Sequence, residues 1–144
     1  MSDYPEATRE RLLDAAAEVL LATVAADRTG LVGYFREIMA AGRYLYDARQ
    51  KYADNALVTA LFQRTEAGEA NASEEPLTRE RLLERLGEVG ELVKDDEEGA
   101  EFKRFLFELA EHVSKAAGGF LRPRISEDEA AFLAQLRVLL KMPD

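Results

Sequence analysis

Carboxylates are the side chains in this sequence that could do chemistry. The 144 residues include 28 Asp and Glu, one His and no Cys. Ca²⁺ and Mg²⁺ need several oxygen ligands that converge on one point, so the run from Asp95 to Glu98 is a candidate cation site. The same run lies where a helix is expected to start, and acidic charges there interact favourably with the helix dipole. A helix start explains the run without a metal, and the spacing of an EF-hand loop is absent from the sequence.

The residue types give catalysis no support. His112 is the only histidine and borders the apolar face of an expected helix, where a packed or half-exposed side chain is the commoner arrangement. Without cysteine or a second histidine, a zinc site is not expected. The sequence holds no Gly-x-Ser-x-Gly motif and no glycine-rich phosphate loop after a strand. We therefore expect a protein that is not an enzyme.

A six-residue block occurs twice in the sequence. Thr8 to Leu13 is identical to Thr78 to Leu83, and the same offset matches Glu18-Val19 to Glu88-Val89. The repeat predicts two related helical halves, each of which opens with the same helix. The alternative is convergence, because a capping Thr, charges in the first turn and a Leu pair facing the core are a common way to start a helix.

The elements that position these residues are predicted to be helices, because apolar residues recur with helical spacing and no segment requires a strand. Ser126 and Glu129 form a capping box for the last helix. Residues 65–76 lack apolar periodicity and are predicted to be a linker. The fold class is all-α: a compact bundle of about six helices in a single domain, 1–144, with two pseudo-symmetric three-helix halves at about 1–64 and 77–144. The expected helices cover about 8–26, 31–52, 55–62, 78–93, the segment between the acidic run and Gly118, and the segment from Ser126 to Pro143.

Two segments are candidate partner-binding surfaces. Phe35, Met39 and Tyr46 widen the apolar arc of the helix expected at 31–52. They form either an exposed stripe or the second side of a buried central helix, and burial is the commoner arrangement. In that helix, Gly42 is interpreted as a packing notch where another backbone approaches.

The second segment is the loop 118–124, which places Phe120 beside Arg122 and Arg124. Exposed apolar and Arg side chains in loops are frequent contact sites. The alternative is that the loop tucks under the last helix and that its arginines pair with Glu127 or Asp128.

Charge and hydropathy limit the classes of partner. The formal net charge of −9 disfavours nucleic acid and anionic lipid, because such a surface repels phosphates. The longest Ala- and Leu-rich stretch, Ala15 to Ala26, contains Glu18 and is too short to cross a bilayer, and the first residues do not form a signal peptide. We expect a cytoplasmic protein without membrane insertion, for which a protein partner or a homo-oligomer is possible.

Ala25-Ala26-Asp27 follows an Ala-rich helix, and the loop from Gly118 precedes Ile125-Ser126-Glu127-Asp128-Glu129. In these segments the chain resembles the TerB-like superfamily of tellurite resistance, in which an Ala-Ala-Asp-Gly turn is followed by an apolar residue, a capping residue and a Glu three positions later. The first segment keeps the aspartate and departs afterwards. The second keeps Ile125, Ser126 and Glu129 and carries an insertion at 120–124.

The resemblance implies a role in stress-response systems and divalent-cation binding by acidic residues. Asp27 stands where the turn aspartate would be, Glu37 is the nearest carboxylate on the next helix, and Glu129 belongs to the second segment. If the halves are pseudo-symmetric, these three could converge on a cation, the only cofactor considered. The main hypothesis is a non-catalytic helical interaction or stress-response accessory module. The alternative is a divalent-cation-binding protein that uses acidic turns between helices.

Overall fold

The computed structural model describes residues 4–26, 30–66, 79–117 and 127–142, and within these ranges the regular structure is helical throughout. The all-α prediction is confirmed. The helices, in chain order, are α1 (Glu6–Leu13), α2 (Ala15–Ala26), α3 (Gly30–Lys51), α4 (Ala56–Glu66), α5 (Arg79–Leu92), α6 (Glu97–Ala117) and α7 (Glu127–Leu139).

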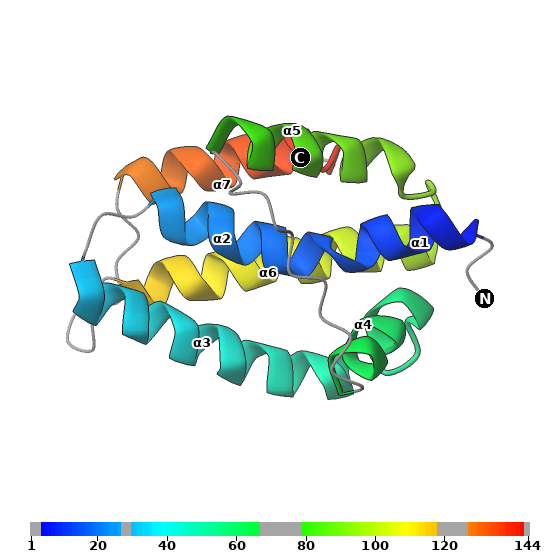
Figure 1. Ribbon diagram of the computed structural model, residues 1–144, viewed down its shortest axis with the longest axis horizontal. Helices are drawn as coiled ribbons and strands as arrows, with labels where there is room; N and C mark the ends of the chain where they lie inside the picture. The colour runs from blue at the N-terminus through cyan, green and yellow to red at the C-terminus, as the bar shows by residue number, and fades with distance from the viewer. Residues whose placement is uncertain (1–3, 27–29, 67–78, 118–126, 143–144) are drawn as a thin grey trace.

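The predicted first helix is divided into α1 and α2 at Asp14. The backbone hydrogen bonds continue across the division: the Asp14 amide donates to the Glu10 carbonyl at 3.3 Å, and the Glu18 amide donates to the Asp14 carbonyl at 3.1 Å. The two segments therefore follow each other almost end to end, as Figure 1 shows.

Side chains cap two of the helices. The Asn55 side-chain oxygen accepts hydrogen bonds from the Leu57 and Val58 amides at 3.1 Å each, so Asn55 is the N-cap of α4. The Asp96 carboxylate accepts from the Gly99 amide at 2.7 Å at the start of α6. The acidic run thus contributes to a helix start, as the sequence indicated.

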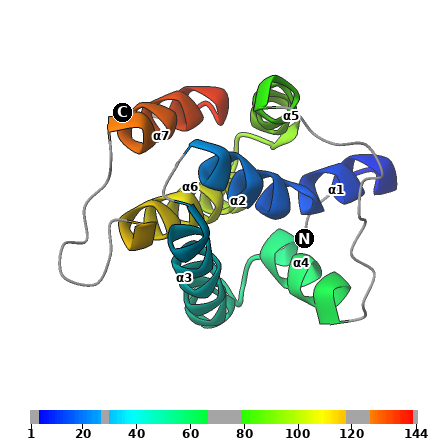
Figure 2. The same ribbon diagram turned by 60° about the vertical axis from the view of Figure 1, so that its left-hand side comes forward.

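The centre of the bundle is formed by α2 and α6. α2 packs against α3, α5, α6 and α7, and α6 also packs against α3 and α4. Figures 1 and 2 show α3 along one side of the bundle and α5 with α7 along the other. The prediction that the helix at 31–52 is central was wrong, since within its described part only the face of Ala41, Tyr44, Ala48 and Tyr52 is buried. Small side chains at Ala15, Ala16 and Ala22 suit α2 to the central position, because they let several helices approach closely.

The largest buried side chains come mainly from α6 and the helices beside it. The apolar residues that recur with helical spacing along α6 form a buried stripe: Phe102, Phe105, Leu106, Leu109 and Val113 are all at most 1% exposed. Rings from the residue after α3 and from α4 pack on this stripe, since the Phe105 centroid lies 6.0 Å from that of Tyr52 and 6.5 Å from that of Phe62. The core is thus shared between the first and second halves of the chain.

Close backbone approach occurs at Gly90 and not at Gly42. A Cβ added to Gly90 would overlap the Leu139 carbonyl oxygen and lie 3.1 Å from the Leu140 Cα, so α5 and α7 cross where a side chain has no room. A Cβ at Gly42 would meet nothing within 4 Å. The packing notch predicted at Gly42 is therefore wrong. The pseudo-symmetry of the two halves stays a prediction.

None of the described helices combines the length and the apolar content that a bilayer crossing requires.

Candidate functional site

The three predicted cation ligands do not have described side chains. Asp27 lies outside the described residues, whereas Glu37 lies in α3 and Glu129 in the first turn of α7. In Figure 1, the end of α2 and the starts of α3 and α7 lie at the same end of the bundle. Among the residues that the structure describes, no group of three or more His, Asp or Glu side chains is arranged to hold a metal ion. The cation site at Asp27, Glu37 and Glu129 stays a prediction.

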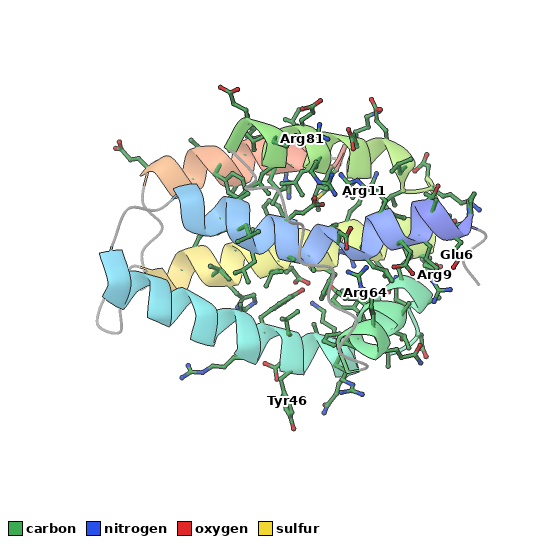
Figure 3. The ribbon with its side chains drawn as sticks, in the orientation of Figure 1. Glu6, Arg9, Arg11, Tyr46, Arg64 and Arg81 are labelled. Atoms are coloured by element: carbon green, nitrogen blue, oxygen red, sulfur yellow. The ribbon has the colours of Figure 1, made fainter. Side chains whose placement is uncertain are left out.

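Only one of the predicted partner-binding residues can be assessed. Phe120, Arg122 and Arg124 lie outside the described residues, and the side chains of Phe35 and Met39 in α3 are not described. Tyr46 is 72% exposed. The burial expected for Tyr46 is therefore wrong, and in Figure 3 its ring points away from the bundle.

The face of α3 that points away from α6 is the best-defined candidate surface. Gly42, Arg43, Tyr46, Gln50 and, at its edge, Arg49 are exposed on it, and we call these five residues the outer face of α3. Arg43 and Arg49 each lie three residues from Tyr46, so one guanidinium stands about one helical turn to either side of the phenol. In sequence, Phe35 and Met39 precede Tyr46 by helical spacing, in the same row of the helix.

The opposite face of α3 is fixed to α6 by hydrogen bonds from two tyrosines. The Tyr44 hydroxyl donates to the Phe105 carbonyl at 2.8 Å, and the Tyr52 hydroxyl donates to the Glu108 carboxylate. Lys51 also binds Glu108, at 3.0 Å. The Tyr44 ring stacks on the exposed His112 ring with centroids 4.9 Å apart. These contacts hold α3 in one orientation, so its outer face is presented rigidly.

The ionisable groups between α3 and α6 stabilise the contact of the two helices and are not arranged for proton transfer. Burial raises the pKa of Glu108, but hydrogen bonds from Tyr52 and Lys51 and the charges of Lys51 and His112 outweigh it and hold that pKa below its ordinary value. Burial, followed by the nearby Glu108, raises the pKa of both Tyr44 and Tyr52 far above the usual range. Both phenols thus stay neutral donors, and Glu108 stays an anionic acceptor, which is the protonation pattern of a fixed helix contact.

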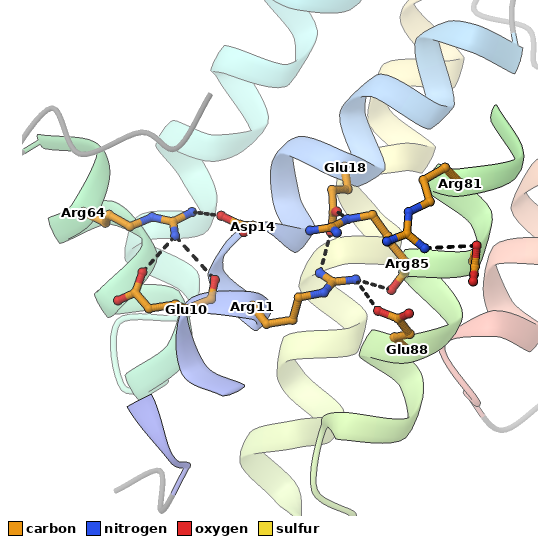
Figure 4. A network of polar contacts seen from close by, with 9 residues as sticks. Glu10, Arg11, Asp14, Glu18, Arg64, Arg81, Arg85 and Glu88 are labelled. Atoms are coloured by element: carbon orange, nitrogen blue, oxygen red, sulfur yellow. Dashed lines mark hydrogen bonds and ion pairs between the residues drawn. The ribbon is translucent and has the colours of Figure 1, made fainter. Parts of the chain in front are cut away.

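A second polar cluster joins the two copies of the repeat. Glu18, only 3% exposed, lies between two arginines: it binds Arg11 at 2.8 Å and also pairs with Arg85 (Figure 4). Arg11 reaches further, to the Arg85 carbonyl at 2.7 Å and the Glu88 carboxylate at 3.2 Å. Both oxygens of the buried carboxylate are therefore paired with arginines.

A third arginine extends this cluster to α4. Arg64 binds the Glu10 carboxylate at 3.2 Å and the Asp14 carboxylate at 2.9 Å (Figure 4). Arg64 therefore connects α4 to the residues at which α1 ends and α2 begins. The ion pairs of this cluster thus join α1, α2, α4 and α5.

Sequence reasoning missed both polar clusters. The sequence could have predicted that Tyr44 and Tyr52 face the same neighbouring helix, since the two lie on one helical face with Ala48 between them. Glu18 carried a weaker signal: it was the one charge within an Ala- and Leu-rich stretch, but its partner Arg85 is 67 residues away. Such long-range pairs become visible only once the helices are placed.

The chain was compared with protein-family models, curated proteins and solved structures, and no match was found in any of the three.

Proposed function

We propose that this protein is a non-catalytic helical module that binds another protein through the outer face of α3. The observation that carries the proposal is the 72% exposure of Tyr46 on a helix whose other face is fixed to α6. A large aromatic side chain held outward on a rigid element is the usual anchor of a protein interface. A role as an accessory of stress-response systems, as the TerB-like resemblance implies, belongs to the same proposal.

The composition of the outer face supports this choice. Interface centres are enriched in Tyr, Met and Arg and depleted of Lys and Glu. Tyr46 stands between Arg43 and Arg49, and Met39 belongs to the same helical row by its spacing. Among the residues whose side chains the structure describes, the other large exposed apolar side chains, Leu21, Leu92 and Val138, lie on three different helices.

Photocrosslinking from position 46 tests the proposal. Tyr46 would be replaced by benzoylphenylalanine, and Val138, which is 76% exposed on α7, would carry the same probe as the matched control. We expect irradiation in the native cell to give discrete protein adducts from position 46 and none of the same size from position 138. Equal adducts from both positions, or none from position 46, would contradict the proposal.

A further inference from the structure

The exposed side of α3 is complementary to itself when it is turned end over end. We infer that two chains of this protein pair through it, with their α3 helices antiparallel and related by a twofold axis. Tyr46 of each chain then lies over Gly42 of the other, and Arg43 of each chain meets Asp47 of the other. The inference rests on the proposed function and goes further, because it names the partner as a second chain of the same protein.

Gly42 and Tyr46 form a recess and a projection on the same side of α3. They are four residues apart, so they lie about one helical turn from each other. The Tyr46 side chain is 72% exposed, whereas a Cβ built on Gly42 would meet nothing within 4 Å. In an antiparallel pair centred between these two residues, each tyrosine stands opposite the glycine of the other chain, so the projection meets the recess twice.

The pair also accounts for a glycine that the single chain does not require. Gly42 lies in the interior of α3, where glycine is less favourable than alanine. No described part of the chain comes close enough to exclude a side chain at this position. A ring from a second chain would need the space, because a residue without a Cβ lets a neighbouring helix approach closely.

The two charges beside this row select the antiparallel direction. Arg43 and Asp47 are both exposed, and each follows a member of the row by one residue, so both lie on the same flank of α3. When two helices pack antiparallel, the same flank of each meets, which brings Arg43 of one chain to Asp47 of the other. In a parallel pair this flank would meet the opposite flank, which carries Arg49. Opposite charges across the contact therefore favour the antiparallel pair.

A second chain matches this surface better than a partner of one charge. Arg43 and Asp47 stand side by side, so neither a purely acidic nor a purely basic segment could satisfy both of them. The matching surface carries the same charges in the reverse order, and the same helix presents that order when it is reversed. The formal charge of −9 opposes the approach of two chains, but salt at about 0.15 M screens such repulsion over about 8 Å.

An exchange of charges across the twofold axis tests the inference. Arg43→Asp makes both sides of each charged contact acidic, and Asp47→Arg makes both sides basic, so neither variant should pair with itself. An equimolar mixture of the two variants restores opposite charges at both contacts. Within each single helix the two charges remain alike, so recovery in the mixture can come only from contacts between chains. Sedimentation velocity of the full chain would measure the fraction of dimer.

We expect the parent to form dimers as its concentration rises to about 0.5 mM. Arg43→Asp, Asp47→Arg and Tyr46→Ala are each expected to raise the dissociation constant by about tenfold or more, and the mixture should return it to within about threefold of the parent value. Asp47→Arg lowers the net negative charge, so its effect cannot come from general repulsion. Gly42→Gln should also weaken pairing, because it fills the recess, although glutamine is the better helix former.

The control is Arg9→Asp, which changes the net charge as Arg43→Asp does but at an exposed residue of α1. It should leave the dissociation constant unchanged. Circular dichroism of each variant would verify that the helices are intact.

Three results would overturn the inference: a parent that stays monomeric over this concentration range, dimers that survive both charge changes, or a mixture that does not recover. The crosslinking experiment separates this failure from that of the proposed function. Adducts from position 46 at twice the mass of the chain agree with the pair. Adducts of other masses alone would remove the pair and still support docking of a different protein at α3. Absence of both dimers and adducts would remove the proposed function as well.

Discussion

Glu18 is the residue whose burial is hardest to reconcile with its charge. A carboxylate in the interior is stable only if its lost hydration is replaced, and here Arg11 and Arg85 replace it. Because the two arginines are themselves mostly covered, removing the carboxylate would leave two guanidiniums facing each other without an anion.

We predict that Glu18→Gln lowers the free energy of unfolding by about 3 kcal/mol, as expected when one partner of a buried ion pair is removed. Urea unfolding at neutral pH would measure the change. The control is Glu84→Gln, since Glu84 is 62% exposed and pairs with Arg81 at 3.2 Å. That surface change is expected to cost less than about 1 kcal/mol. A similar small effect at Glu18 would contradict the structural role given to the cluster.

Glu108 predicts a pH dependence of stability. Its pKa in the folded protein lies below the ordinary value of about 4.3. A carboxyl group with a lowered folded pKa stabilises the fold above its unfolded pKa, and this contribution is lost as the pH falls through the folded value. The Glu108→Gln variant should therefore be less stable than the parent at pH 7. We expect a difference of about 1 kcal/mol, because the contact of Glu108 with Tyr52 and Lys51 is partly exposed to solvent.

The difference between the Glu108→Gln variant and the parent should shrink as the pH falls from the unfolded pKa of about 4.3 through the lowered folded pKa, because the parent carboxyl group becomes protonated over this range. Urea unfolding at pH 7 and at pH 3 would measure both differences. The same change at Glu111, on the same helix, is the control and is expected to have little effect at either pH. An unchanged difference at pH 3 would show that Glu108 acts through packing and not through its charge.

At the scale of the helices, two glycines in similar sequence settings differ in their surroundings. Gly90→Ala would drive a methyl group into the backbone of α7 at Leu139 and Leu140. We predict a loss of at least about 2 kcal/mol, since neither backbone can move without disturbing the core between α5 and α7. Gly42→Ala, in open space within α3, is predicted to stabilise the protein by about 0.5–1 kcal/mol. Thermal unfolding of both variants would test the pair, and equal effects would contradict this placement of α5 against α7.

The elements were largely predictable from the sequence because helix spacing and capping act locally. The acidic run before α6 and the helical spacing of the apolar residues after it predicted that helix from a few neighbouring residues each. The arrangement of the helices was not predictable in the same way. The wide apolar arc of 31–52 indicated a central helix, but Tyr46 is exposed, and the Ala-rich α2 occupies the centre instead.

The candidate site was predictable only in part, for the same reason. The spacing of Phe35, Met39 and Tyr46 predicted one row of the helix as a possible surface, and the choice between exposure and burial of Tyr46 depended on where α6 lies. Glu18 with Arg85, and Tyr52 with Glu108, join residues more than 50 positions apart, and no local pattern predicts such pairs.

At the scale of the whole molecule, the two halves of the chain share one core. α2 belongs to the first half and packs against α5, α6 and α7, and α3 packs against α6. Neither half retains its main contacts when the other is removed, so we predict a single cooperative unfolding transition.

The tyrosines make this prediction easy to test. All five of them, from Tyr4 to Tyr52, lie in the first half, and the chain has no tryptophan. Tyrosine fluorescence therefore reports on the first half alone, while far-ultraviolet circular dichroism reports on all helices. We expect both signals to change at the same urea concentration. A tyrosine transition that clearly precedes the loss of helix would contradict a shared core.

The two copies of the six-residue block have come to occupy different environments. Arg11 is mostly covered and holds Glu18 and Glu88, whereas its counterpart Arg81 is half-exposed and pairs with its neighbour Glu84. Leu13 is buried, but its counterpart Leu83 is only partly so. Identical residues in the two blocks are therefore under different structural constraints. Mutation is expected to alter Arg81 more readily than Arg11, so the identity of the two blocks would be lost first in the second one.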